Sequence, residues 1–285
     1  MAPPHKSMPH PAVRPAATVV VVRNGEEALE VFLVKRHRKS KFMGQFYVFP
    51  GGRVDASDVE WFKDGNASLG TMHDGAWEAD MDEESPSDSA FAFAAIRETA
   101  EESGILLAQD AHGNIAGHDV AEAVFNALKA GQPFIEILAH YSLTPTFSAI
   151  HPLAWWVTPS FETYRYNTRF YLAAMPPSQR ASYDELETTD GVWMTAQAAL
   201  DAWHDEKIML APPTVCNLEL LVGAVSPEEV LARTTRPIYA NLPEVIAQAD
   251  GDKFLVVPGD ELHPTKQDAP AHRTRFRILG PGRFR

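Results

Sequence analysis

Three glutamates in one short segment have the spacing that a catalytic or metal-binding helix needs. Glu98, Glu101 and Glu102 are three and four positions apart, so on a helix their carboxylates share one face. The same face continues toward the N-terminus through apolar side chains, namely Phe91, Ala94 and Ala95. The carboxylates therefore extend a stripe that we expect to face a core.

Such a cluster is costly unless something compensates its charge. Two carboxylates about 4 Å apart repel each other by roughly 4 kcal/mol at an effective dielectric constant near 20, and partial burial adds a desolvation cost. Protonation or a bound cation must offset both. Clustered carboxylate oxygens suit Mg²⁺ or Mn²⁺, which also coordinate substrate phosphates. For the spacing alone, the acidic side of a solvated surface helix is the alternative.

The residues around these glutamates resemble the Nudix box. Phe49-Pro50-Gly51-Gly52 lies upstream, and Gly52 matches the opening glycine of that motif. The second half of the motif is an Arg-Glu pair followed by a Glu-Glu pair and a glycine. The residues that match it in register are Arg97, Glu98, Glu101, Glu102, Gly104 and Ile105.

The sequence departs from the box in two places. Thr99 stands where an aliphatic residue is usual, and Asp58 stands where the family has a glutamate. Between Asp58 and Arg97 there are 38 residues, so the box carries a long insertion. This split box is similar to that of the Nudix subgroup that includes peroxisomal coenzyme A diphosphatase. The similarity covers roughly residues 17–205 and is clearest at 33–55, 161–174 and 184–200.

The resemblance implies roles for the matched residues. In that family the carbonyl of the glycine matched by Gly51 and the glutamates matched by Glu98, Glu101 and Glu102 bind divalent cations, here Mg²⁺ or Mn²⁺. The same three glutamates share the candidacy for the base that activates water. Arg97 is expected to hold a box carboxylate through a bidentate pair, which its planar guanidinium favours. A surface salt bridge is the alternative for Arg97.

Two further groups are candidates for the site. An acid from outside the box commonly joins a Nudix site, and Glu187 is our candidate because it precedes a strand-like run; Asp184 and Glu185 compete with it. A solvated surface acid is the alternative for each of the three. The basic run at 35–41 (KRHRKSK) is a candidate for contacts with substrate phosphates. A solvated strand end is the alternative for that run.

The order of apolar runs predicts an α+β protein, which the resemblance refines to a Nudix-type α/β/α sandwich with a mixed sheet. Strands are expected where β-branched and aromatic residues cluster, and Asn24-Gly25 predicts a hairpin turn between the first two. The expected strands are 17–24, 30–35, 47–49, 154–158, 168–174, 191–194 and 254–257. The expected helices are 90–103, 119–130, 133–140, 195–205, 214–223 and 226–233.

The chain divides into three parts. Residues 1–16 are rich in proline and are expected to form a disordered tail. Residues 17–205 are expected to form the Nudix domain, and 206–285 a mainly helical C-terminal extension that caps the pocket or forms a dimer contact. Within the domain, 59–89 is expected to be an acidic insertion: residues 56–89 hold ten Asp or Glu and one Lys, which is typical of a solvated loop with at most one short helix.

The bulk composition disfavours several kinds of partner. The formal net charge of −13 repels nucleic-acid polymers, whereas a cation can link an acidic protein to a phosphorylated small molecule. No apolar run of about 18 residues exists, so no membrane span is expected. Cys216 is the only cysteine, which fits a reducing compartment. We expect a cytoplasmic protein, with a second copy of itself as the candidate protein partner.

The expected function is metal-dependent hydrolysis of the diphosphate linkage in a nucleoside diphosphate compound. By resemblance, the first candidate substrate is coenzyme A or an acyl derivative. An ADP-ribose or nucleotide-sugar diphosphatase would use the same metal site. A catalytically silent Nudix-fold ligand sensor is a third hypothesis; the retention of all three box glutamates argues against it, whereas Asp58 and the insertion argue for it.

Overall fold

The structure is a computed structural model. It describes residues 12–38, 43–63, 75–78, 85–182, 188–234, 236–248, 251–265, 270, 272–280 and 283–285, with only the backbone of 188 and 189. The N-terminal residues 1–11 of the expected tail therefore lie outside the described residues. The candidate acids Asp184, Glu185 and Glu187 lie outside them as well.

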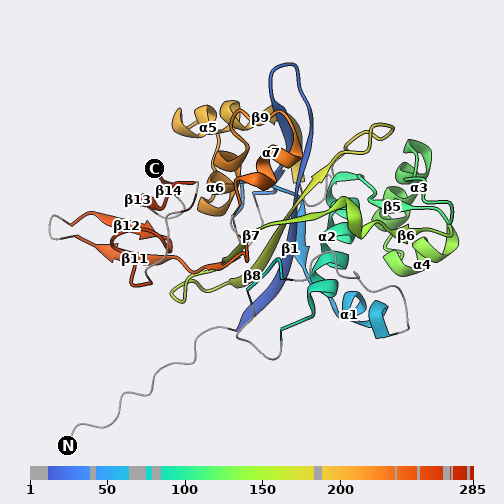
Figure 1. Cartoon of the computed structure of the whole chain (residues 1–285), viewed down its shortest axis with the longest axis horizontal. Helices are drawn as coiled ribbons and strands as arrows, with labels where there is room; N and C mark the ends of the chain where they lie inside the picture. The colour runs from blue at the N-terminus through green and yellow to red at the C-terminus, as the bar shows by residue number, and fades with distance from the viewer. Residues whose placement is uncertain are drawn as a thin grey trace, which may run out of the picture.

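A mixed sheet forms the centre of the molecule (Figure 1). Its strands are β1 (Val13–Asn24), β2 (Leu29–Arg36), β3 (Tyr47–Val48), β4 (Gly51–Arg53), β7 (His151–Val157), β8 (Arg165–Ala174), β9 (Thr188–Thr195) and β10 (Ala240–Asn241). The order is β10-β7-β8-β1-β2-β3, with β4 paired to β1 and β9 paired to β2. The β1–β8 and β10–β7 pairs are parallel and the others are antiparallel. The predicted mixed sheet and the first hairpin are confirmed.

The first two strands diverge, and this divergence makes room for the site. β1 and β2 pair through residues 22–24 and 29–31. Farther along, β4 pairs with residues 16–18 of β1, while β3 pairs with the end of β2. The glycines of the box therefore lie where the sheet opens between its two central strands.

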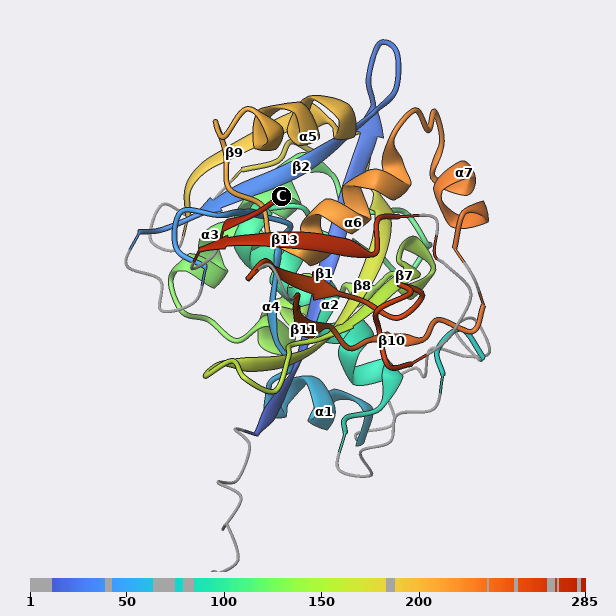
Figure 2. The ribbon, with the colours of Figure 1, turned by 90° about the vertical axis from the view of Figure 1, so that its left-hand side faces the viewer.

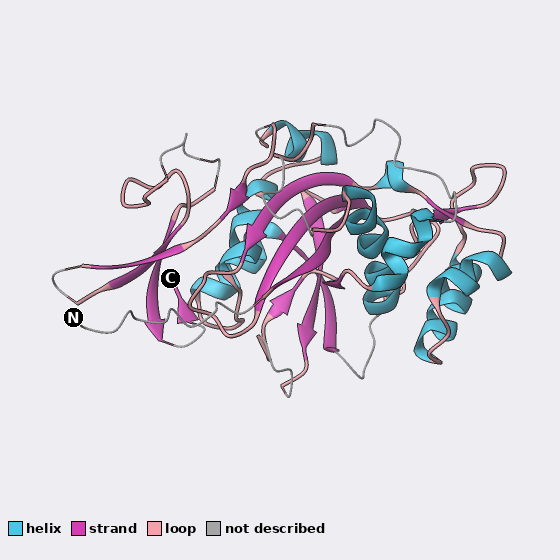
Figure 3. Cartoon of the chain, turned by 90° about the horizontal axis from the view of Figure 1, so that it is seen from below, coloured by secondary structure: helices cyan, strands magenta, loops and turns pink. Residues whose placement is uncertain are grey.

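Helices cover both faces of this sheet (Figure 3). They are α1 (Ala56–Lys63), α2 (Asp88–Ser103), α3 (His118–Lys129), α4 (Phe134–His140), α5 (Ala196–His204), α6 (Pro212–Leu221) and α7 (Pro227–Ala232). On one face, Val19 and Val21 pack in the same cluster as Phe91 of α2. On the other, Val20 and Val22 pack in the same cluster as side chains of α5 and α6. Residues of β1 thus alternate between two apolar layers, as a strand buried on both faces must.

Smaller elements complete the α2 side of the molecule. A short helix η1 (Phe147–Ala149) precedes β7, and β5 (Ala108–Gln109) pairs with β6 (Thr144–Pro145). No helix in the described ranges combines the length and the apolar character that crossing a bilayer requires.

The prediction of a mainly helical C-terminal extension is wrong. After α6 and α7 come β10 and a second sheet of four strands in the order β11-β12-β13-β14, namely β11 (Glu244–Ala247), β12 (Lys253–Val256), β13 (Arg275–Gly280) and β14 (Arg283–Phe284). In Figure 2 this sheet lies in front of β1 and β8, on the side of α6. In β13, Arg275 and Arg277 alternate with Phe276 and Ile278, a period of two that favours a strand. Phe276 is fully buried in the cluster that also contains Leu255.

Two other expectations need correction. The tail was expected to reach residue 16, but β1 begins at Val13, because residues 13–16 pair in parallel register with residues 165–168 of β8. The acidic insertion was expected to be a solvated loop, but Trp61 and Phe62 of α1 pack against the core, and Trp77 is buried within it. The average composition of the insertion is acidic and polar, so it did not indicate that these three aromatic side chains pack into the core.

Candidate active site

Helix α2 presents the acidic residues from a fixed frame. Its first turn is capped by Ser87, whose side chain accepts a hydrogen bond from the Ala90 N–H at 3.3 Å. It ends at Gly104 in the left-handed region, φ 64°, with the Gly104 N–H bonded to the Ala100 carbonyl, the usual role of a glycine after a helix. Most α2 residues between these caps are buried. The predicted helix, with glutamates extending its buried face, is confirmed.

Arg97 connects the two halves of the box. Its Nε and Nη2 atoms donate to the two oxygens of Asp58, both at 2.8 Å. Nη2 also donates to the Arg53 carbonyl, and Nη1 donates to Glu98 and Glu101, all at 2.9 Å. All five guanidinium donors are thus used. The expected bidentate pair exists, and its partner is Asp58, the residue that stands in place of the usual glutamate.

The three glutamates differ in exposure and in partners. The Glu98 side chain is 13% exposed and that of Glu101 is 35% exposed. Glu102 is buried, and its carboxylate accepts a hydrogen bond from the Gly51 N–H at 2.9 Å. Two of the three carboxylates are therefore held largely away from solvent.

Both box glycines are required by close approach rather than by an unusual backbone angle. A Cβ on Gly52 would lie 2.5 Å from the Glu98 carboxylate. A Cβ on Gly51 would lie 2.4 Å from the Thr18 hydroxyl and 2.5 Å from the Ala17 carbonyl. The missing side chain at Gly52 thus leaves the space that the Glu98 carboxylate occupies, while Gly51 lets β4 pair closely with β1.

Burial and crowding change the acidity of the cluster. Burial raises the pKa of Glu98 to about 8; Arg97 opposes this shift, while Glu102 and Glu101 add to it. Burial also raises the pKa of Glu101, again against the effect of Arg97. Burial works against the charge of Arg97, but Asp58, Glu98 and Glu101 together raise the pKa of its guanidinium above the usual value. The cluster favours protons or another cation in addition to Arg97.

A cavity of about 460 Å³, called the acidic cavity below, adjoins the cluster. At one end it is lined by Gly51, Gly52, Glu98, Glu101 and Glu102. Its other lining residues come mainly from β1, β2, β3, β4, β7, β8 and the start of α6, and include Arg36, Arg53, Trp156, Thr168, Phe170, Pro213 and Thr214. The cavity therefore joins acidic, basic and aromatic side chains from separate parts of the chain.

Two buried donors in the acidic cavity lack a partner within the described residues. They are the Nε atom of Arg36 and the Nε1 atom of Trp156. Buried N–H groups without partners are rare and commonly mark a place where a ligand or water binds. Neighbouring atoms close both N–H groups off from solvent, so an oxygen acceptor would reach them only if the surrounding side chains move.

The sequence predicted the acidic residues of the site but not several other residues that line the acidic cavity. Gly51, Arg97, Glu98, Glu101 and Glu102 all lie together, as expected. Residues 39–41 of the basic run lie outside the described residues; in its described part, Arg36 lines the cavity, whereas Lys35 lies over the Tyr47 ring. The contributions of Trp156 and Thr214 were missed, because aromatic and α6 residues read equally well as core in the sequence.

The carboxylates do not form a preformed metal-binding group. Among the residues that the structure describes, no three His, Cys, Asp or Glu side chains are arranged to hold an ion. Instead Glu98 and Glu101 each place one oxygen on Arg97, and Glu102 places one on the Gly51 N–H. Binding a cation would require these side chains to turn toward a common point.

Known proteins are similar to this chain in sequence and in fold. The acyl-coenzyme A diphosphatase NUDT19 of Xenopus laevis is 27% identical over 295 residues, which covers 90% of this chain and 77% of that protein. That of Gallus gallus is 29% identical over 287 residues, covering 84% and 74%. The crystal structure of a Nudix hydrolase from Alicyclobacillus acidocaldarius superposes with a TM-score of 0.61 at 27% identity, covering 78% of this chain and 96% of that chain.

The family model of the NUDT19 Nudix domain matches residues 12–221, from the residue before β1 to the end of α6. This range contains both halves of the split box and both helical layers of the sandwich. The chain therefore belongs to the family of the NUDT19 Nudix domain.

Proposed function

We propose that this chain hydrolyses the diphosphate linkage of acyl-coenzyme A or coenzyme A, releasing an adenosine bisphosphate and a phosphopantetheine compound. The observation that carries the proposal is the cluster of Glu98, Glu101 and Glu102 at one end of the acidic cavity, in a family whose curated relatives are acyl-coenzyme A diphosphatases. A diphosphate needs charge neutralisation and an activated water, and this end of the cavity is suited to both.

The donor set fits a divalent cation. Clustered carboxylate oxygens suit Mg²⁺ or Mn²⁺, and the space left by Gly52 admits the Glu98 carboxylate. Burial raises the pKa of Glu98 to about 8, so a neighbouring cation would favour its charged form. Glu98, Glu101, Glu102 and the Gly51 carbonyl would hold the cation. When bound, the cation would neutralise the diphosphate and polarise its phosphorus.

The protein's own residues then position the reaction. Arg97 fixes Glu98 and Glu101 through Nη1, and the Gly51 N–H fixes Glu102. One of these three carboxylates accepts the proton of the attacking water. The water oxygen forms a bond to one phosphorus, the bridging P–O bond breaks, and the bridging oxygen leaves with the other phosphate. Arg36, whose side chain lines the acidic cavity, would hold a phosphate oxygen through its guanidinium charge.

A substrate panel with identified products tests the proposal. The full-length protein is incubated with Mg²⁺ or Mn²⁺ and with coenzyme A, octanoyl-coenzyme A, ADP-ribose or UDP-glucose, and the products are identified by mass spectrometry. We expect phosphopantetheine or its octanoyl derivative, together with an adenosine bisphosphate. If ADP-ribose were the only compound hydrolysed, the proposal that the substrate is coenzyme A or acyl-coenzyme A would be wrong. Binding of these compounds without any hydrolysis would support the ligand-sensor hypothesis instead.

The site assignment is tested by the double variant Glu101→Gln with Glu102→Gln. We expect kcat to fall by roughly a hundredfold or more, since a catalytic base and its neighbours contribute at least that much, while the melting temperature changes little. The control replaces two exposed glutamates of α3 and α4, Glu122→Gln with Glu136→Gln, and should keep full activity. A double variant with the wild-type rate would show that the assignment is wrong.

A further inference from the structure

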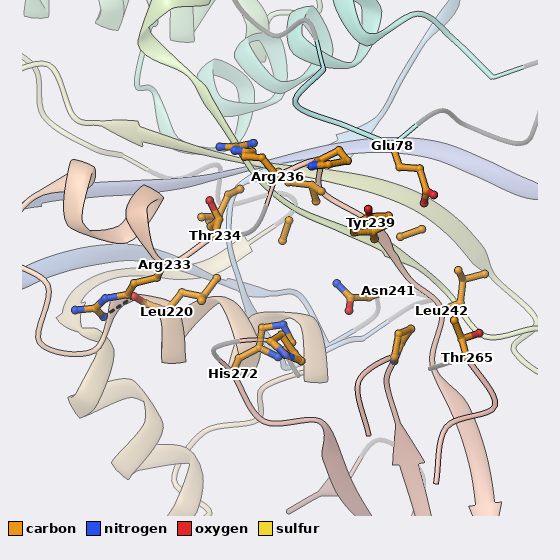
Figure 4. A pocket seen from close by; sticks show the side chains of 17 residues that line it. Glu78, Leu220, Arg233, Thr234, Arg236, Tyr239, Asn241, Leu242, Thr265 and His272 are labelled. Atoms are coloured by element: carbon orange, nitrogen blue, oxygen red, sulfur yellow. Dashed lines mark hydrogen bonds between the residues drawn. The ribbon is translucent and has the colours of Figure 1, made fainter. Parts of the chain in front are cut away.

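A second cavity, about twice as large as the acidic cavity, lies at the β7–β10 edge of the main sheet (Figure 4). Its volume is about 950 Å³. Its lining is both apolar and polar, and includes Leu153, Ala154, Leu220, Asn241, Leu242 and His272. In Figure 4 the Arg233 guanidinium turns toward the Leu220 carbonyl, to which it donates at 2.7 Å. We call this the second cavity.

One row of paired residues forms a floor shared by both cavities. Arg53 pairs with Ala16, Ala16 with Thr168, Thr168 with Trp156, and Trp156 with Asn241. Paired residues of neighbouring strands point to the same face. The first four line the acidic cavity, and Asn241 lines the second cavity.

A neighbouring row repeats this arrangement. Gly51 pairs with Thr18, Thr18 with Phe170, and Phe170 with Ala154. Gly51, Thr18 and Phe170 line the acidic cavity, whereas Ala154 lines the second cavity. Two adjacent rows on one face of the sheet thus lead from the box glycines to the second cavity.

The two cavities also share a wall. The Trp156 ring of the acidic cavity lies 6.2 Å from the His272 ring of the second cavity, centroid to centroid. Helix α6 borders both, with Thr214 near its start and Leu220 near its end. Six residues of helix span about 9 Å, so the same helix borders both cavities.

The distance along this floor fits one part of the substrate. From Arg53 to Asn241 there are four inter-strand spacings of about 4.8 Å, or roughly 19 Å along the sheet. The pantetheine arm, whose backbone is as long as that of four to five residues, spans roughly 15 Å when extended. The adenosine is attached directly to the diphosphate and stays near the acidic cavity. Only the arm and the group on its sulfur reach the second cavity.

We propose that the second cavity receives the acyl end of an acyl-coenzyme A whose diphosphate lies at the glutamates. This inference rests on the proposed function. Leu153, Ala154, Leu220 and Leu242 supply apolar surface for the acyl chain, while the Asn241 amide lies where the thioester or the last amide of the arm would pass. The second cavity thereby sets the preference between acylated and free coenzyme A.

Leu242→Glu tests this role at an exposed position of the lining, where folding should tolerate the change. We expect kcat/KM for octanoyl-coenzyme A to fall at least tenfold, because a carboxylate now meets the alkyl chain, while kcat/KM for free coenzyme A changes less than threefold. Leu279→Glu, at an exposed leucine of β13 outside the lining, is the matched control. Thr265→Trp, which fills the same cavity, should reproduce the selective loss. An equal effect on both substrates, or no effect, overturns the inference.

A binding measurement separates this inference from the proposed function. S-octanoylpantetheine, which has no diphosphate, is titrated into the EDTA-treated full chain by calorimetry. We expect one site per chain, weakened at least tenfold by Leu242→Glu and unchanged by Glu101→Gln with Glu102→Gln. If neither Leu242→Glu nor Thr265→Trp changes the affinity for S-octanoylpantetheine, or if the wild type does not bind it, the inference is wrong. If the wild type binds this compound but hydrolyses neither coenzyme A nor acyl-coenzyme A, the proposed function is wrong, while the second cavity is still a binding site for the acylated arm.

Discussion

At the scale of single residues, Arg97 shows how one cation can organise a group of acids. Its guanidinium meets Asp58, which is fully buried, and also Glu98 and Glu101. A buried ion pair compensates its desolvation only when its remaining donors and acceptors are satisfied, and here all five donors are. The pair therefore fixes the positions of the site carboxylates as well as joining two helices.

Arg97→Lys should destabilise the protein because an ammonium cannot form the bidentate pair. We expect a loss of roughly 2–4 kcal/mol in the free energy of unfolding, since the fully buried Asp58 would lose part of its compensation. Urea denaturation followed by circular dichroism measures this loss. Arg283→Lys, in the exposed pair with Glu206, serves as the control and should cost less than about 1 kcal/mol. Equal losses in the two variants would show that the buried network contributes little.

Glu98 should make the stability of the metal-free protein depend on pH. Its pKa is raised from 4.5 to about 8 in the folded state, so the folded state binds more protons than the unfolded state between these values. Its contribution to stability is therefore full below about pH 4.5 and is lost as pH rises to about 8. In EDTA, Glu98→Gln should raise the melting temperature at pH 8 more than at pH 5. Thermal unfolding at both values checks this, with the exposed Glu122→Gln as a control that should follow the wild type.

At the scale of elements, the box insertion is anchored by aromatic side chains. Trp61 of α1 lies 5.0 Å from Phe93 of α2, ring to ring. Trp77 lies 5.6 Å from Tyr171, and the buried Arg169 guanidinium lies 4.8 Å from the Trp77 ring. The insertion is acidic on average, but single aromatic residues within it, Trp61 and Trp77, make these core contacts. Trimming the whole of 59–86 would therefore remove core contacts, contrary to the expectation for a solvated loop.

Trp77→Ala should lower stability although it lies within the insertion. We expect a loss of about 3–5 kcal/mol, the usual cost of deleting a buried tryptophan, because both the cavity left and the lost contact with Arg169 are unfavourable. Chemical denaturation measures it, and Phe161→Ala, at a largely exposed aromatic residue, should be close to neutral. If Trp77→Ala were also neutral, the insertion would not be part of the core.

The longer elements could be predicted from the sequence and the shorter ones could not. The strong helix formers of 90–103, followed by Gly104, predicted α2 within two residues, and β-branched runs predicted β1 and β2. Strands of two to four residues, such as β4 and β10, have too few positions to show a period and form because longer neighbours pair with them. In the C-terminal sheet, β12 was predicted as 254–257 and β11 and β14 are equally short, whereas the period of two in the six residues of β13 was overlooked.

At the scale of the whole molecule, the site is assembled from parts that are distant in sequence. Helix α2 supplies the acids, whereas β7, β8 and α6 supply the far wall of the acidic cavity. The box motif could predict the first, because its residues are local. Trp156 and Thr214 depend on tertiary packing, for which a single sequence contains no local signal. The expected cytoplasmic location and the dimer stay predictions.

The pair between Asp58 and Arg97 has a consequence for how this protein can change over time. It closes a segment of 38 residues, and the entropic cost of closing a flexible segment grows only with the logarithm of its length. Doubling that segment would cost about 0.6 kcal/mol, which is similar in size to the effect of one surface substitution. Evolution is therefore free to lengthen or shorten the insertion, provided that its two ends and the anchoring aromatics remain, while the geometry of the acids is preserved.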